Sequence, residues 1–190
     1  MGNEISIEDR YKLLINARNF HYENFSKWLT YFYLAIGALF IAYYNVCSSN
    51  TIKEDKRELL EFSIVLLGYI SSLLWYWSSK GYYYWNINFI TLVNYYEKNI
   101  LKLPENERVY FVFANKKEQN NYISPIKGAN ISTSKIAILF AFIITTFWGF
   151  FLFTFLIKQI GCPCLTGCLI IKSLLFSIIS IYLLSSFIPK

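Results

Sequence analysis

The 190-residue chain is 55% hydrophobic and 20% aromatic, and only 16% of its residues are charged. This composition excludes an ordinary soluble domain, whose apolar residues would be gathered in a single water-excluding core. The formal net charge of +6 indicates attraction to anionic lipid headgroups. Nucleic acid is not expected as a partner, because the basic residues are interspersed with acids and form no stripe.

The first segment, residues 1–27, is predicted to be a cytoplasmic amphipathic helix running into the first membrane span. Ser6 precedes acids at Glu8 and Asp9, which is typical of a helix start with a capping side chain. Apolar or aromatic positions then recur at steps of three and four: Leu14, Ala17, His21, Phe25 and Trp28. The polar face carries both signs of charge, which favours packing on other protein over lying on lipid.

Four stretches are long and apolar enough to cross a bilayer, which takes about 20 residues. They are Trp28–Val46, Leu59–Trp77, Ile136–Ile157 and Leu165–Pro189. Buried helices of soluble domains are seldom this long and apolar on every side. Transmembrane helices are therefore predicted in residues 28–77 and 135–189, two in each part.

The positive charges predict how the chain is oriented. Of the 18 Lys and Arg residues, 13 fall before the first span, between the second and third spans, or at the last residue. The other 5 fall on the opposite side. Because Lys-rich and Arg-rich loops stay in the cytoplasm, both termini and the long central connection are predicted to be cytoplasmic.

The central connection, residues 78–134, is predicted to form a small cytoplasmic module. An aromatic three-four pattern predicts that the second span continues as a helix until Pro104. Its members are Trp85, Phe89, Leu92, Tyr96 and Ile100. Apolar runs at Val109–Phe113 and Tyr122–Ile126 indicate a short β hairpin or an irregular cap. Either Ser132 or Ser134 is expected to cap the third span.

The predicted fold class is an all-α membrane protein with four transmembrane helices, an N-terminal amphipathic helix and a small module. No catalytic, cofactor-binding or metal-binding pattern accompanies this fold. The single histidine, His21, lies on the apolar side of the first helix, where an interface residue is expected more often than a ligand. The sequence therefore predicts a protein without enzymatic activity and without a cofactor.

The four cysteines fall together at the predicted outer face. Cys47 ends the first span, while Cys162, Cys164 and Cys168 flank the loop between the last two spans. Three alternatives remain open, namely a disulfide from Cys47 to that loop, free buried thiols, or a metal site. A bridge between Cys162 and Cys164 is not expected, because a single intervening residue holds them too tightly.

Small and hydroxylated residues recur at helix-packing spacing within the spans. Ser173, Ser177 and Ser180 share a face of the fourth span, and Lys172 lies near its outer end. Similar spacing is found at Ala35, Ala38 and Ala42 in the first span and at Gly68 and Ser72 in the second. Such faces pack helices closely, with the lysine reaching the headgroups, or they line a wetted pore. Packing is the favoured interpretation.

A family resemblance is carried by the nine residues Gly81–Phe89. They resemble the Gly-Ser-Lys-Tyr-Trp-Gln-x-Asn-Trp signature of RipA-type octameric membrane proteins. Gly81, Tyr84, Trp85 and Asn88 match, Asn86 and Phe89 match nearly, and Tyr82 and Tyr83 depart. Ala17–Phe20 and Ser134–Ile136 also look like this family, in the same order, so the resemblance runs from about Tyr11 to Trp148.

The resemblance implies a bacterial inner-membrane homo-oligomer, an octamer, with no established enzymatic activity. We expect the subunit contacts in the central module, because burial of apolar surface is favourable in water and not between spans in lipid. The candidate contact residues are Gly81, Tyr84, Trp85, Asn88, Phe89, Leu92 and Tyr96. Expected partners are further copies of the chain, membrane lipids and a cytoplasmic protein.

Two functions fit these features. The first is a scaffold that recruits its partner, and the second is a channel or membrane-permeabilising effector of a bacterial defence system. The sequence does not choose between them, because helix packing and pore lining use the same residue types.

Overall fold

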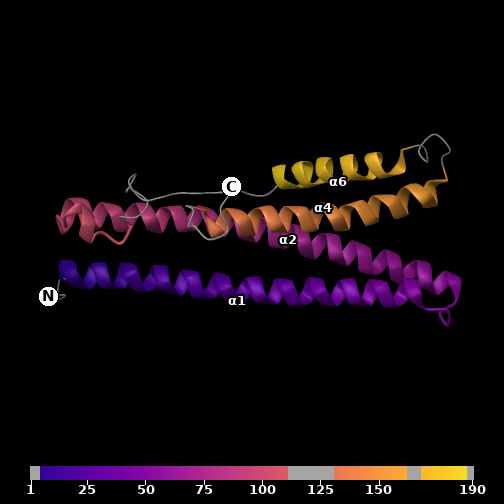
Figure 1. Cartoon of the computed structure of the whole chain (residues 1–190), viewed down its shortest axis with the longest axis horizontal. Helices are drawn as coiled ribbons and strands as arrows, with labels where there is room; N and C mark the ends of the chain where they lie inside the picture. The colour runs from indigo at the N-terminus through magenta and orange to yellow at the C-terminus, as the bar shows by residue number, and fades with distance from the viewer. Residues whose placement is uncertain (1–4, 111–130, 162–167, 188–190) are drawn as a thin grey trace, which may run out of the picture. The chain divides into compact units, whose positions relative to one another are not determined.

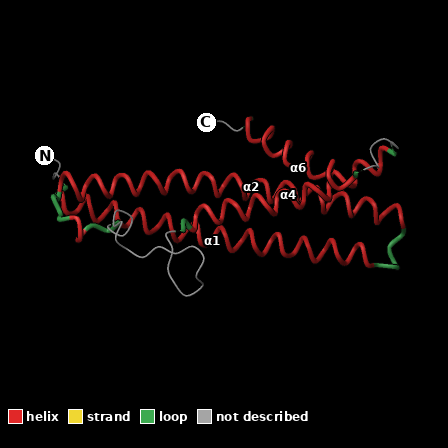
Figure 2. The backbone as a smooth tube through the Cα atoms, turned by 45° about the horizontal axis from the view of Figure 1, so that its top comes forward, coloured by secondary structure: helices red, strands yellow, loops and turns green. Residues whose placement is uncertain are grey.

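The computed structural model describes residues 5–110, 131–161 and 168–187. Its helices are α1 (Ile7–Ser48), α2 (Glu54–Tyr95), α4 (Thr133–Ile160) and α6 (Leu169–Ser186), labelled in Figure 1. A π-helical turn at Tyr96–Ile100 and a 3-10 turn at Glu105–Glu107 follow α2. Figure 2 shows helices and loops and no strand in this part of the chain, which confirms the all-α fold class there.

Helix α1 begins at the predicted capping residue. The backbone N–H of Asp9 donates a 3.1 Å hydrogen bond to Ser6 Oγ, and the Ser6 hydroxyl donates to Asp9 Oδ2 at 2.8 Å. The helix then continues for 42 residues to Ser48. The amphipathic segment and the first span are therefore one element and not two, because no proline or glycine occurs between Ile7 and Gly37.

Helix α2 also continues far beyond its predicted span. It runs for 42 residues to Tyr95 and passes directly into the π-helical turn. The helical conformation ends at Ile100, four residues before Pro104. In a continued helix, the proline ring would clash with the carbonyl group of Ile100. Lys102 then adopts a positive φ of 53°, the left-handed conformation in which many helices end.

The predicted hairpin falls mostly outside the described residues. Val109 and Tyr110 are the two described positions of its first run, and they form a turn and not a strand.

Helix α4 begins at one of the two predicted capping residues. The backbone N–H of Lys135 donates to Ser132 Oγ at 3.4 Å, so Ser132, and not Ser134, caps this helix.

The chain divides into two compact units, each formed by two separate stretches of sequence. Unit 1 comprises Met1–Lys27 and Gly81–Lys135, and unit 2 comprises Trp28–Lys80 and Ile136–Lys190. Helices α1, α2 with its π-helical turn, α4 and α6 are the four in the described residues that are long and apolar enough to cross a membrane. The number of predicted spans is thereby confirmed, on the basis of length and composition.

The core of unit 2 joins α2, α4 and α6. Val65, Tyr69 and Leu73 of α2 pack with Trp148 and Leu152 of α4 and Ile181 of α6. The indole of Trp148 is fully buried and lies so close to Gly68 that a Cβ atom there would overlap it. Gly68, predicted as a packing residue, thus permits the close approach of α2 and α4.

Candidate assembly surface

Within unit 1, one face of α2 and of its π-helical turn is buried. Tyr82, Asn86, Val93 and Glu97 are each less than 9% exposed, and they follow one another at helical spacing along one side of the helix. Tyr82 stacks on Phe25 of α1 with ring centroids 3.5 Å apart and an interplanar angle of 5°. Burial raises the pKa of Tyr82 above its ordinary value, because the phenolate would lose its hydration there.

His21 belongs to the same contact between α1 and α2. Its ring stacks on Tyr82 at a centroid distance of 4.5 Å and tilts toward Phe89 at 5.3 Å. Its Nε2 lies 3.5 Å from the Tyr82 carbonyl oxygen. These contacts make His21 an interface residue, as the sequence indicated.

Glu97 fastens the end of α2 to the start of α1, although sequence analysis did not single it out. It lies in the π-helical turn with no exposed surface. Its Oε1 accepts a 2.6 Å hydrogen bond from the Tyr11 hydroxyl, and the Val109 backbone N–H donates to both carboxylate oxygens at 3.1 and 3.2 Å. The available signal was its register, because Glu97 continues the helical spacing of the buried residues Tyr82, Asn86 and Val93.

Arg18 of α1 makes a second contact between distant segments, with Tyr110 in the turn that follows the 3-10 turn. Its Nη1 donates to the Tyr110 hydroxyl at 3.3 Å, and its guanidinium lies 5.7 Å from the centroids of both the Tyr110 and Tyr22 rings. Burial raises the pKa of Tyr110, while the positive charge of Arg18 acts in the opposite direction. Arg18 is part of the Ala17–Phe20 motif, so this motif places a structural residue inside unit 1.

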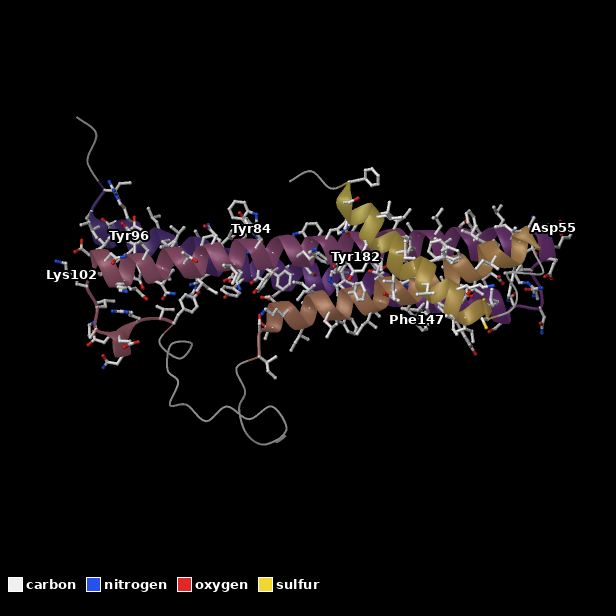
Figure 3. All side chains as sticks on the ribbon, turned by 90° about the horizontal axis from the view of Figure 1, so that it is seen from above. Asp55, Tyr84, Tyr96, Lys102, Phe147 and Tyr182 are labelled. Atoms are coloured by element: carbon white, nitrogen blue, oxygen red, sulfur yellow. The ribbon has the colours of Figure 1, made fainter. Side chains whose placement is uncertain are left out.

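The outer face of α2 in unit 1 is aromatic and uncovered. Trp85 is 55% exposed, Leu92 38% and Tyr95 54%, and the exposed Gly81 and Asn88 share their side of the helix at helical spacing. Tyr84, beside this row, is 71% exposed, and its ring stands clear of the helix in Figure 3. We name these six residues, Gly81, Tyr84, Trp85, Asn88, Leu92 and Tyr95, the α2 outer face.

The predicted contact set is therefore divided between two faces. Gly81, Tyr84, Trp85, Asn88 and Leu92 lie on the outer face, whereas Phe89 and Tyr96 are half-buried. Phe89 turns toward His21, so this member of the aromatic pattern helps to form the core of unit 1. Periodicity did not separate the two faces because Tyr82, Tyr83, Tyr84 and Trp85 place aromatic side chains around the whole helix.

Helix α1 has an uncovered apolar row of its own in unit 1. Leu13 is 57% exposed and Phe20 65%, and the exposed Ala17 lies between them. The half-buried residues Tyr11, Arg18 and His21, which contact α2 and the turns after it, lie on a different side of α1. We name Leu13, Ala17 and Phe20 the α1 outer face.

Two further residues of the segment Gly81–Phe89 meet the start of α4. Asn86 Nδ2 donates to Ser134 Oγ at 3.5 Å, and the Lys135 ammonium lies 5.8 Å from the centroid of the Tyr83 ring. Segments 48 residues apart in sequence are thus joined within unit 1. The resemblance motifs at Gly81–Phe89 and Ser134–Ile136 contact each other here.

The hydroxylated face of the fourth span lies against α4. Ser173 and Ser177 are fully buried, and Ser180 is half-buried. Ser177 donates to the Thr146 carbonyl at 2.9 Å, and Ser173 accepts from the Thr154 hydroxyl at 3.0 Å. Ser180 shares a 2.5 Å hydrogen bond with Tyr69, and Lys172 is half-buried on the same helix.

Among the predicted cysteine sites, Cys47 and Cys168 are exposed, and no disulfide joins these two residues. Cys162 and Cys164 lie outside the described residues, so the disulfide from Cys47 to the last loop stays a prediction. Among the residues that the structure describes, no three His, Cys, Asp or Glu side chains are grouped to hold a metal ion.

Four apolar helices of spanning length define a multi-pass membrane protein. The exposed α2 and α1 outer faces of unit 1 suit this protein to self-association. The family model of octameric membrane proteins matches residues 8–157, and the chain belongs to this family. No curated protein and no solved structure matches the chain. The predicted membership in the octameric membrane protein family is thereby confirmed.

Proposed function

We propose that this chain is the protomer of a closed ring, an octamer, in a bacterial cytoplasmic membrane, where it acts as a scaffold and not as an enzyme. Both termini and unit 1 lie in the cytoplasm in this proposal. The ring of unit 1 modules then presents a surface to a cytoplasmic protein partner. The family description supports the assembly, and the charge distribution of the loops supports the orientation.

The observation that carries the proposal is the exposure of the α2 outer face. Its aromatic side chains lie beyond the predicted second span, where water and not lipid surrounds them. Each Å² of apolar surface removed from water contributes about 25 cal/mol, so contact with a further copy of the chain is favourable. The spans gain no comparable free energy from one another in lipid.

A closed ring needs two different surfaces on each protomer, because every neighbour contact is head to tail. Unit 1 supplies them as the α2 outer face and the α1 outer face. Phe20 and Leu13 of one protomer would pack against Trp85 and Leu92 of the next. Their high exposure in the single chain supports this pairing.

The channel alternative has weaker support. Ser173 and Ser177, the hydroxyl groups that would line a wetted wall, are fully buried within one protomer and hydrogen-bonded to α4. We therefore assign this face to packing of α6 on α4, with Gly149 needed because a Cβ atom there would overlap the Ser177 hydroxyl.

The test is the oligomer mass in mild detergent, measured by light scattering on a size-exclusion column. Trp85→Ala with Leu92→Ala is expected to shift the population toward monomer while α-helix content is unchanged. Tyr182→Ala is the matched control, because this aromatic residue of α6 is 66% exposed and outside unit 1. If the control dissociates the oligomer and the double variant does not, the contacts lie between spans and the proposal is wrong.

A further inference from the structure

A cavity of about 370 Å³ lies in unit 2, between the start of α2 and the end of α4. The two helices diverge toward this end of unit 2, as Figure 1 shows. A volume of this size lies within the range of small-molecule sites in proteins. The cavity is not part of the assembly surface, because all of its lining residues belong to unit 2.

The α2 wall of the cavity carries an excess of negative charge. Glu54, Glu58 and Glu61 line it at helical spacing. Arg57 forms an ion pair with Glu54, which leaves the carboxylates of Glu58 and Glu61 without a salt-bridge partner among the described residues. Two carboxylates that face one cavity favour a cationic group with several hydrogen-bond donors.

The α4 wall carries one positive charge above an aromatic surface. Lys158 lines the cavity and forms no ion pair within the described part of the chain. Phe155 and Phe151 line it one and two helical turns away from Lys158, toward the middle of α4, and Tyr43 of α1 joins them. The cavity thus combines both signs of charge at one end with aromatic rings at the other.

We propose that this cavity binds the headgroup of a phospholipid that bears a primary ammonium and a phosphate, of the phosphatidylethanolamine class. The ammonium donates to the carboxylates of Glu58 and Glu61, and the phosphate lies against Lys158. The glycerol and upper acyl segments pack on Phe151 and Phe155. A lipid is favoured over a soluble molecule because the aromatic end extends along spans that already lie in hydrocarbon.

This assignment excludes two other headgroups by their chemistry. An anionic phosphatidylglycerol brings no cation, and its phosphate would meet two carboxylates for one lysine. A trimethylated phosphatidylcholine has a cation but no N–H donor for Glu58 and Glu61. Hydrogen bonds to charged groups typically contribute enough to give about a tenfold difference in binding for each one.

The experiment is native mass spectrometry of the delipidated full-length protein, titrated with each lipid in detergent. Phosphatidylethanolamine is expected to bind about tenfold more tightly than phosphatidylglycerol or phosphatidylcholine. Glu58→Gln with Glu61→Gln is expected to remove this preference. Asp55→Asn is the matched control, an exposed acid in the same region of α2 that does not line the cavity and is labelled in Figure 3. It is expected to keep the preference.

Several results would overturn the inference. Equal or tighter binding of phosphatidylglycerol would do so, as would a preference that survives in the double glutamine variant. Binding of phosphatidylcholine as tight as that of phosphatidylethanolamine would show that no N–H donor is recognised. Soluble phosphoethanolamine serves as a further arm, and binding as tight as that of the lipid would assign the cavity to a water-soluble ligand. Circular dichroism confirms that each variant keeps its helices.

Discussion

The hydroxyl of Tyr11 donates a 2.6 Å hydrogen bond to Oε1 of Glu97, a residue 86 positions later in the chain. The bond joins the first turns of α1 to the π-helical turn after α2. Because Glu97 has no exposed surface, its carboxyl oxygens find their hydrogen-bond donors within the protein and not in water. This contact therefore contributes to holding the two helix ends of unit 1 together.

Removing the Glu97 carboxylate should loosen unit 1 locally. Glu97→Ala leaves the Tyr11 hydroxyl and the Val109 N–H without their acceptor, which costs about 1–3 kcal/mol. Hydrogen exchange measured by mass spectrometry should become faster at the start of α1 and around the π-helical turn. Glu105→Ala, at an exposed position of the 3-10 turn, is the control. Unchanged exchange in Glu97→Ala would show that apolar packing alone holds the two ends.

The same contact predicts a loss of stability at alkaline pH. Burial, and next the hydrogen bond to Glu97, raise the pKa of Tyr11 above its ordinary value of 10.0. The folded state then holds this proton more tightly than the unfolded state. The contribution of Tyr11 to stability is therefore fully present below pH 10 and is lost as the pH rises above 10. Thermal unfolding between pH 8 and pH 11 should show this fall, and Tyr11→Phe should make it shallower. An equal slope in the variant would contradict the assignment to Tyr11.

The proposed head-to-tail contact predicts a specific cross-link between protomers. In a background with all four cysteines replaced by serine, Phe20→Cys and Trp85→Cys together should yield covalent ladders under mild oxidation. Each single variant should yield far less, because its partner thiol is missing. Phe20→Cys paired with Tyr182→Cys is the control. Ladders with the control pair and none with the first pair would place the neighbour contact elsewhere.

The charge distribution predicts the topology. Single cysteines introduced near Asn50 should react with a membrane-impermeant maleimide in intact cells, whereas those near Lys116 should react only after permeabilisation. The reason is the concentration of Lys and Arg on the side of the central connection. Labelling of Lys116→Cys in intact cells would show that the whole chain has the opposite orientation to the one predicted.

The predicted outer disulfide can be tested directly. Mass spectrometry of the protein, alkylated at harvest and digested without reduction, should recover a peptide of Cys47 joined to one from the last loop. Cys47 and Cys168 are exposed, so both are open to alkylation wherever they are reduced. Recovery of alkylated peptides alone would show that the thiols stay free.

The sequence alone determined the membrane class, the number of spans, the helix start at Ser6 and the family. The membrane class and the spans follow from local composition, since an apolar run of about 20 residues has few stable environments other than a bilayer. The helix start follows from the capping pattern at Ser6, and the family from the resemblance carried by Gly81–Phe89. The length of α2 beyond its span was also apparent, because the aromatic spacing continues and no proline precedes Pro104.

Only the tertiary structure decided which side of α2 faces α1. Aromatic side chains surround the helix at Tyr82–Trp85, so the hydrophobic pattern did not predict which face is buried. In the structure the buried residues are Tyr82, Asn86, Val93 and Glu97. From the sequence alone, Glu97 and Arg18 resemble surface charges. The fold brings Tyr11 beside Glu97 and Tyr110 beside Arg18. A charge is stable in a buried position only where donors or acceptors from distant segments converge on it, and that convergence is a property of the fold and not of any local sequence pattern.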